Sequence, residues 1–166
     1  MYCSFALAAA AASDSAAPVG EIMQIEWQDL LPPSERGSST LVPPTPLHDY
    51  LLGESTPPPD QPMNFAINEQ LADRLIRLPG FVVPLEIDRQ GRVTELFLVP
   101  FYGACIHVPP PPPNQIVHVT MAEPLLLESM DAAYWITGRM RIATRETRLG
   151  TSAYSVHEAL SEAYDF

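Results

Sequence analysis

The sequence predicts a mainly β protein whose folded domain is a five-stranded OB-like barrel. Apolar and polar residues alternate with a period of two in several segments after residue 80, which is typical of strands with one buried face. The expected order of elements is three strands, one helix and two strands. OB barrels have this order, and the helix between their third and fourth strands plugs one end of the barrel. The 166 residues suffice for one domain of ordinary size.

Residues 1–20 are expected to be a signal-like leader. An apolar run from Phe5 to Ala12 precedes small residues where a leader could be cut, and it is much shorter than the ~20 residues that span a bilayer. We therefore expect a periplasmic or exported protein with no integral membrane segment in the mature chain. The usual positive start of a signal peptide is missing, which suggests a truncated leader or a misplaced start codon. A longer true N-terminus would reopen the question of a lipoprotein anchor.

Residues 21–63 are expected to form an acidic, proline-rich arm. Ten of the 19 prolines lie at or before Pro62, and residues 1–60 hold eight acids and one base, Arg36. Trp27, Leu30 and Leu31 share one face of a short helix or turn. Trp27 would therefore anchor the arm on the domain.

The OB-like domain is expected to span residues 64–166. Residues 68–80 give the clearest helical pattern, with Asn68 as the cap and three leucines at helical spacing. Alternating residues then predict a hairpin of strands at 81–88 and 92–100.

The second half of the domain continues with a third strand at 115–121, in which alternate side chains lie on opposite faces and His118 lies on the face opposite Val117 and Val119. Residues 123–130 are expected to form the short helix, with Pro124 in its first turn. Strands at 133–144 and 151–160 complete the barrel.

The charge of the chain restricts its partners. The net charge is −11, and all nine basic residues are arginines, so lysine-based chemistry is excluded. An acidic domain without lysine is a poor ligand for nucleic acids or anionic lipids. We expect a monomer with a protein partner and no nucleic acid.

The stretch GACIHVPPPPPNQ, residues 103–115, holds the candidate metal ligands. Cys105 and His107 lie two residues apart, so an extended backbone would turn both side chains to one face. A thiolate and an imidazole suit Zn²⁺, which needs further ligands, and His118, Glu123 and His48 are the candidates. No cofactor is certain, and Zn²⁺ is the one that this pattern favours.

The same pair leaves an enzymatic alternative open. Cys105 could act as a nucleophile or redox thiol with His107 lowering its pKa, although neighbours two apart on one strand make a loose pair and a third, orienting group is missing. No serine-hydrolase, zinc-protease or phosphate-loop motif occurs in the chain.

The five consecutive prolines are the most specific feature of this stretch. As a stiff polyproline II segment they would cross one end of the barrel as a strap, or offer a preformed surface to a partner's aromatic groove. Asn114 and Gln115 would cap backbone groups where the chain re-enters a strand. The predicted partner-binding residues are Pro109, Pro110, Pro111, Pro112, Pro113, Asn114 and Gln115.

The segments LPGFVVPLE, LFLVPFYGACIHVPPPPPNQIV, YWITGRMRI and AYSVHEAL resemble a bacterial exported family, domain of unknown function 3299. The resemblance covers about residues 21–166. It implies a small periplasmic or lipoprotein-like domain, in some genomes encoded beside transport components for metal supply. Cys105, His107 and residues 109–115 match the family motif, whereas His118 stands where relatives often carry another residue.

The sequence therefore predicts an exported, non-enzymatic binding or accessory protein. It would dock a partner, such as a transporter subunit, or a metal through the surface around Cys105, His107 and the prolines. The alternative is a thiol-dependent enzyme or redox protein that uses Cys105 with His107.

Overall fold

The computed structural model describes residues 21–37, 61–104 and 110–164. Strands dominate these residues, and the only helical elements among them are short 3-10 turns. The strands are β1 (Met23–Gln24), β2 (Leu75–Ile87), β3 (Val93–Val99), β4 (Val117–Leu125), β5 (Ala133–Thr147) and β6 (Gly150–Ala163). The 3-10 turns are η1 (Trp27–Leu30), η3 (Glu69–Leu71) and η4 (Pro113–Gln115).

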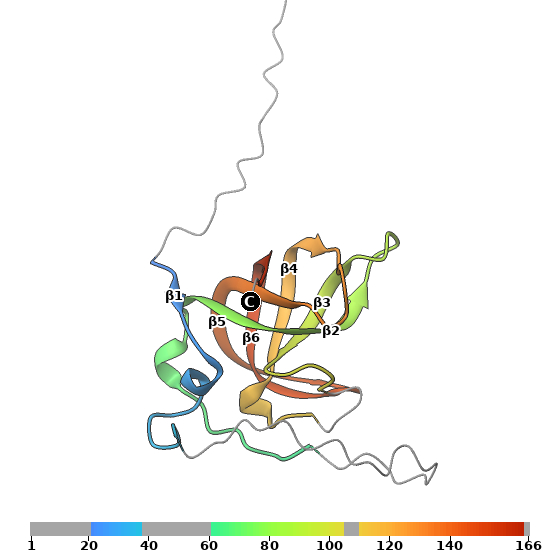
Figure 1. Cartoon of the computed structure of the whole chain (residues 1–166). Coiled ribbons are helices and arrows are strands. Elements are labelled where there is room, and N and C mark those ends of the chain that lie inside the picture. Colours follow the sequence, from blue (N-terminus) through green and yellow to red (C-terminus); the bar gives the residue numbers. More distant parts are fainter. Residues whose placement is uncertain (1–20, 38–60, 105–109, 165–166) are drawn as a thin grey trace, which may run out of the picture.

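Five of the strands form a closed barrel (Figure 1). The strand order is β2-β3-β4-β6-β5, and β5 pairs back with β2 to close the ring. Strands β4 and β6 run parallel, whereas the other neighbours in the ring are antiparallel. The short β1 is an additional strand that runs parallel to β2. The prediction of a mainly β protein with an OB-like barrel is confirmed.

The predicted helix between the third and fourth strands is wrong. Strand β4 continues to Leu125, which is buried and pairs with Val93 of β3. Glu95 pairs with Thr120, so several extra residues of β4, Pro124 among them, form a bulge between these two pairs. Cross-strand pairing and burial of Leu125 therefore override the local helical signal.

The helix predicted at residues 68–80 is also wrong. Asn68 does cap, because its side chain accepts a hydrogen bond from the Gln70 N–H at 3.2 Å, but the turn that it begins is only η3. Asp73 then adopts a positive φ of 59°, and β2 starts at Leu75. The predicted leucines are buried, but the later ones lie on a strand that pairs with β5. Pairing of this segment with β5 therefore overrides the helical spacing of its leucines.

The main core fills the barrel, and the N-terminal segment contributes to it. Ile25, Trp27 and Leu30 belong to the same buried cluster as the barrel strands. The Trp27 indole N–H donates a hydrogen bond to the carbonyl of Pro79 on β2 at 2.7 Å. A Cβ on Gly80 would lie only 2.9 Å from the Trp27 ring, so the strand needs glycine here. The prediction that Trp27 anchors the arm is confirmed.

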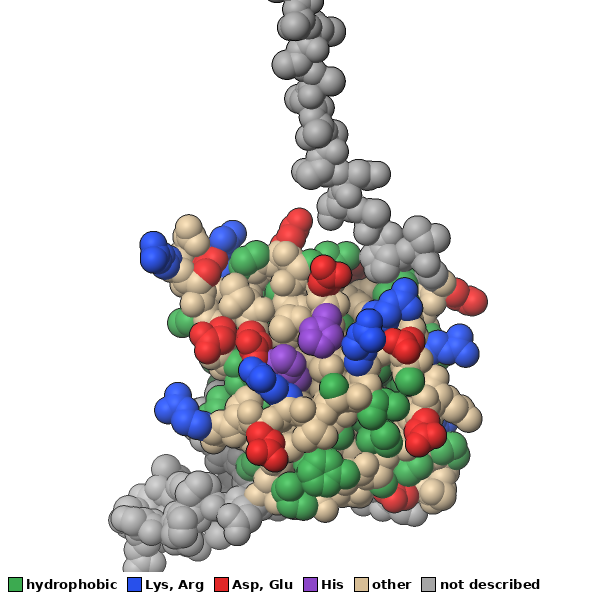
Figure 2. Space-filling view, turned by 180° about the vertical axis from the view of Figure 1, so that it is seen from behind, with side chains coloured by type: hydrophobic (Ala, Val, Ile, Leu, Met, Phe, Trp, Pro, Cys, Tyr) green, Lys and Arg blue, Asp and Glu red, His purple; other side chains and the backbone are tan. Residues whose placement is uncertain are grey.

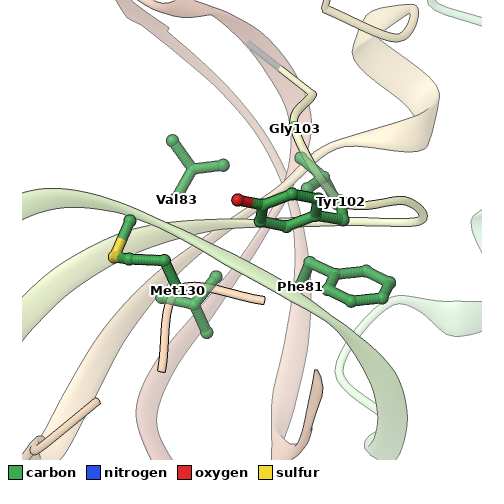
Figure 3. A pocket seen from close by; sticks show the side chains of 7 residues that line it. Phe81, Val83, Tyr102, Gly103 and Met130 are labelled. Atoms are coloured by element: carbon green, nitrogen blue, oxygen red, sulfur yellow. The ribbon is translucent and has the colours of Figure 1, made fainter. Parts of the chain in front are cut away.

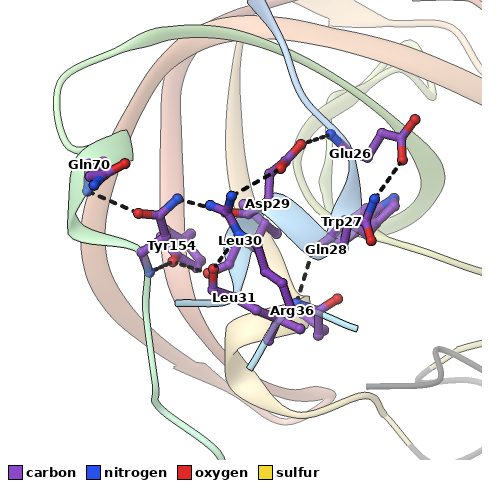
Figure 4. Close-up of polar contacts among 11 residues, drawn as sticks. Glu26, Trp27, Gln28, Asp29, Leu30, Leu31, Arg36, Gln70 and Tyr154 are labelled. Carbon is purple, nitrogen blue, oxygen red and sulfur yellow. Dashed lines mark hydrogen bonds and ion pairs between the residues drawn. The ribbon is translucent and has the colours of Figure 1, made fainter. Parts of the chain in front are cut away.

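Turns η1 and η4 lie together at one end of the barrel (Figure 1). The Leu30 side chain is fully buried there, and the Tyr154 hydroxyl of β6 donates a hydrogen bond to the Leu30 carbonyl at 2.6 Å (Figure 4). The Asn68 backbone N–H donates to the same hydroxyl at 2.7 Å. Burial raises the pKa of Tyr154 to about 12, so this hydroxyl stays neutral. The N-terminal segment therefore covers the end of the barrel at which β4 begins.

A second, smaller cluster lies on the opposite face of β2 and β3. It consists of Val83, Phe97, Val99, Ala104 and Ile116, with Phe81, Leu85 and Phe101 against it. Alternate residues of β2 and β3 thus point either into the barrel or into this cluster. The chain between β3 and β4 covers the cluster, because it supplies Ala104 and Ile116 from its two ends.

Candidate partner-binding site

The described prolines of the predicted strap lie against the fold. Pro111 and Pro113 are buried, whereas Pro110 and Pro112 keep part of their surface exposed. Pro113 begins η4, where its missing N–H costs nothing because the first N–H groups of a helical turn have no partner within it. The segment therefore presents alternate prolines to solvent.

Gln61 clamps this proline segment to the start of β6. Its side-chain amide donates hydrogen bonds of 2.8 Å to the carbonyls of Pro111 and Thr151. Its side-chain oxygen accepts a third hydrogen bond, also of 2.8 Å, from the Thr151 N–H. One side chain thus joins three segments that are far apart in sequence.

Asn114 and Gln115 are fully buried, and their amides bond to backbone carbonyls. Asn114 donates to the Ala66 carbonyl at 2.8 Å, and Gln115 donates to the Trp27 carbonyl at 3.2 Å. The prediction that these two amides cap backbone groups is confirmed. Because both are buried, they can hold the proline segment in place but are not exposed on its surface, where the sequence predicted them to bind a partner.

Cys105, His107 and Pro109 lie outside the described residues. The described residues on either side of them are Ala104, which is fully buried, and Pro110, which is partly exposed. Gly103, just before Ala104, has a φ of +83°, a conformation that favours glycine. The two ends of the motif are therefore fixed on the barrel.

An apolar pocket of about 170 Å³ lies directly beside this fixed point. Figure 3 shows the Tyr102 and Phe81 rings on one side of it and Met130 on the other, and these two rings lie 6.2 Å apart. Tyr102 is 53% exposed and Met130 is 48% exposed, so both line the pocket and remain open to solvent. The pocket is lined by Phe81, Val82, Val83, Val99, Tyr102, Gly103 and Met130.

His118, one of the predicted metal ligands, bonds to a carboxylate. Its Nε2 lies 2.6 Å from the Oε1 atom of Glu95 on the neighbouring strand, and its side chain is nearly buried. This hydrogen bond, opposed by burial and assisted by the charges of His118 and Arg145, holds the pKa of Glu95 below its usual value. No group of three or more potential metal ligands occurs within the described ranges.

A second histidine lies close to this pair on the same outer face. His157 on β6 makes hydrogen bonds with the hydroxyls of Thr120 at 3.1 Å and Ser155 at 3.4 Å. Ser155 pairs in register with His118, so the two histidines flank it, and Figure 2 shows histidines gathered near the middle of this face between arginines. The outer face of β4 and β6 thus carries a continuous polar cluster.

Comparison with known proteins identifies the family of this chain. Residues 27–162 match the family described as "Protein of unknown function (DUF3299)". The chain belongs to this family. The matched region begins at Trp27, so it includes the segment that covers the barrel end as well as the barrel itself.

A solved member of the family supports the same fold. The chain is similar to the crystal structure of a DUF3299 family protein from Pseudomonas aeruginosa PAO1, with 35% sequence identity and a TM-score of 0.75. The similarity covers 89% of this chain and 99% of that chain. A search of curated proteins gave no match. Within the described part of the chain, no helix has the length and apolar character needed to cross a membrane.

Sequence reasoning missed the pocket and the His157 cluster. The pocket joins β2, the end of β3 and the chain before β5, and no local pattern brings Met130 to Tyr102. His157 and Ser155 did carry a signal, because both lie on the polar face of a predicted strand, two residues apart. Their proximity to His118 depends on the parallel pairing of β4 with β6.

Proposed function

We propose that this chain is an exported, non-enzymatic accessory protein that docks a protein partner through the chain between β3 and β4. The carrying observation is that an apolar pocket opens where this chain leaves β3, beside side chains that stay exposed. Apolar side chains that are exposed together around a hollow, as Tyr102 and Met130 are, are typical of interaction sites. The prolines further along the same chain are held on the fold by Gln61, Asn114 and Gln115.

Rigidity supports docking because a fixed surface loses little conformational entropy when it binds. Prolines with a set φ, a clamp of three hydrogen bonds and two buried amides all restrict this chain. The partner that we propose is a protein such as a transporter subunit.

The docking proposal is tested by replacing Pro110, Pro111 and Pro112 together with alanine in the full chain. Proteins that co-purify with the parent chain should be lost or reduced at least tenfold, while circular dichroism shows that the β fold persists. Unchanged co-purification from a folded variant would contradict the proposal. A matched triple replacement of Thr144, Arg145 and Glu146 on the β5–β6 hairpin should leave co-purification intact.

The metal variant of the proposal assigns Zn²⁺ to Cys105 and His107. Titration of mature protein with Zn²⁺ against a chromophoric chelator should show one site that Cys105→Ser and His107→Ala each weaken at least tenfold. Equal uptake by the parent and both variants would exclude it. His118→Ala is the informative comparison, because His118 already bonds to Glu95 and should not change uptake.

The alternative function is a thiol-dependent enzyme or redox protein. The rate of Cys105 alkylation as a function of pH distinguishes it from an accessory protein. An activated thiol would react with an apparent pKa well below that of a free cysteine, about 8.5. We expect ordinary reactivity, or reaction only after unfolding, and His107→Ala should not change it.

Export is proposed from the leader at residues 1–20. Cell fractionation of the full chain should place it outside the cytoplasm, and N-terminal sequencing should show a start within the small residues before Glu21. Recovery of the uncut chain from the cytoplasm would contradict export.

A further inference from the structure

Strand β2 leaves part of one edge without a partner. Residues Leu75 to Phe81 pair with β5, and residues Phe81 to Ile87 pair with β3 on the other side. Beyond Phe81, no backbone hydrogen bond in the described ranges joins the β5-facing edge of β2 to another segment. Such an edge offers main-chain groups to an added strand.

The apolar pocket lies against this edge. Val82 and Val83 line it from β2, and Met130 lines it from the chain just before Ala133, the residue at which β5 joins Phe81. Ile87, further along the edge, is 63% exposed. A strand laid along the edge would therefore have an apolar hollow beside it for one of its side chains.

The charges near the pocket indicate the kind of segment that would fit. Glu86 on the edge and Glu128 and Asp131 on either side of Met130 are all exposed. In the described residues none of these three carboxylates has an ion pair with an arginine. Exposed acids that lie close in sequence to the apolar lining favour a segment whose apolar side chains are flanked by lysine or arginine.

Pro84 argues against pairing of this edge with a second copy of the chain. Proline has no N–H to donate, and together with the charge of Glu86 it interrupts the edge near its middle. Two such edges would bring both prolines and both glutamates together. The edge suits a short segment better than a long symmetric pairing.

We infer that the β2 edge and the adjoining pocket bind a short extended segment of a partner protein that carries apolar side chains beside basic ones. The inference rests on the proposed function, because Tyr102 and Gly103 line the pocket and lead into the same chain. It adds the mode of recognition, which is strand addition with one side chain in the pocket.

The test is selection of a displayed library of random eight-residue peptides on the mature protein. Enriched peptides should alternate large apolar residues with others and carry lysine or arginine. Met130→Lys should weaken their binding at least tenfold, whereas Leu160→Lys should not, since Leu160 is similarly exposed (42%) but lies on β6. Amide exchange should slow at least fivefold at Leu85, Glu86 or Ile87 when such a peptide is bound.

Three results would overturn the inference: no enrichment, enriched peptides that bind the Met130→Lys variant equally well, or a stable dimer through this edge in sedimentation. The proposed function fails separately. If peptide binding depends on Met130 but co-purification is unchanged by the proline replacements, only the proposed function is contradicted. Co-purification that depends on the prolines, without such peptides, would contradict this inference alone.

Discussion

Glu95 shows how one cross-strand contact decides the role of a residue. Its hydrogen bond with the nearly buried His118 holds the pKa of Glu95 below its usual value of about 4.5. The charged form of Glu95 therefore stabilises the folded state at pH values above about 4.5, and this contribution is lost as the pH falls through the lowered pKa. Acid should weaken this part of the barrel.

Glu95→Gln should lower the free energy of unfolding by about 1–2 kcal/mol near pH 6, because it removes a charge-assisted hydrogen bond that is partly solvated. The difference from the parent should shrink as the pH is lowered from 4.5 to 3. Urea unfolding over this pH range measures it. Glu146→Gln, an exposed residue on the neighbouring hairpin, should have almost no effect, and a difference that grows in acid would refute the account.

Predictions for single residues succeeded where neighbouring residues in the sequence indicate the interaction. Asn68 caps a turn two residues on, and the placement of Asn114 and Gln115 at a strand entry suggested their capping role. The contact of His118 with Glu95 was not predicted, because Glu95 lies on another strand. Alternation gave the face of His118 but not its neighbour across the sheet.

At the scale of elements, the proline segment depends on Gln61. Gln61→Ala should lower the free energy of unfolding by about 1–3 kcal/mol, because it leaves three partly buried backbone groups without their partner. Gln61→Glu should be worse, since a carboxylate would face two carbonyl oxygens. Amide exchange at Thr151 should accelerate in Gln61→Ala, which removes the oxygen that the Thr151 N–H bonds to, and unchanged exchange in this variant would show that the clamp is not formed.

The two predicted helices failed for one reason. Residues 68–80 and 123–130 carry leucines at spacings that suit a helix, yet Leu75 and Leu125 are buried through strand pairing with β5 and β3. Short apolar runs do not distinguish a helix from a buried strand. The alternating segments were predicted correctly because their period of two persists over more residues.

For the whole molecule, the N-terminal segment is part of the barrel core. Leu30→Ala should cost about 2–5 kcal/mol, because the side chain is fully buried in the main cluster and lies beside Tyr154. Leu126→Ala, at 66% exposure, should stay within about 0.5 kcal/mol of the parent. Equal thermal midpoints for the two variants would show that the segment does not cover the barrel.

The OB-like barrel was predictable because five alternating segments follow one another along the chain as the strands of OB folds do. The position of the N-terminal segment over the barrel end was not predictable. It depends on contacts between Trp27 and Pro79 and between Leu30 and Tyr154, which are far apart in sequence. The pocket beside Tyr102 depends in the same way on the closed ring of strands.

Docking at the chain between β3 and β4 is tested most directly by a photo-crosslinking residue at position 102 of the full chain in its native host. Tyr102 is exposed at the pocket, and Leu160 serves as the control position. We predict one discrete protein adduct at position 102 that the replacement of Pro110, Pro111 and Pro112 abolishes, and none at position 160. The same adducts at both positions, or none at position 102, would contradict the account.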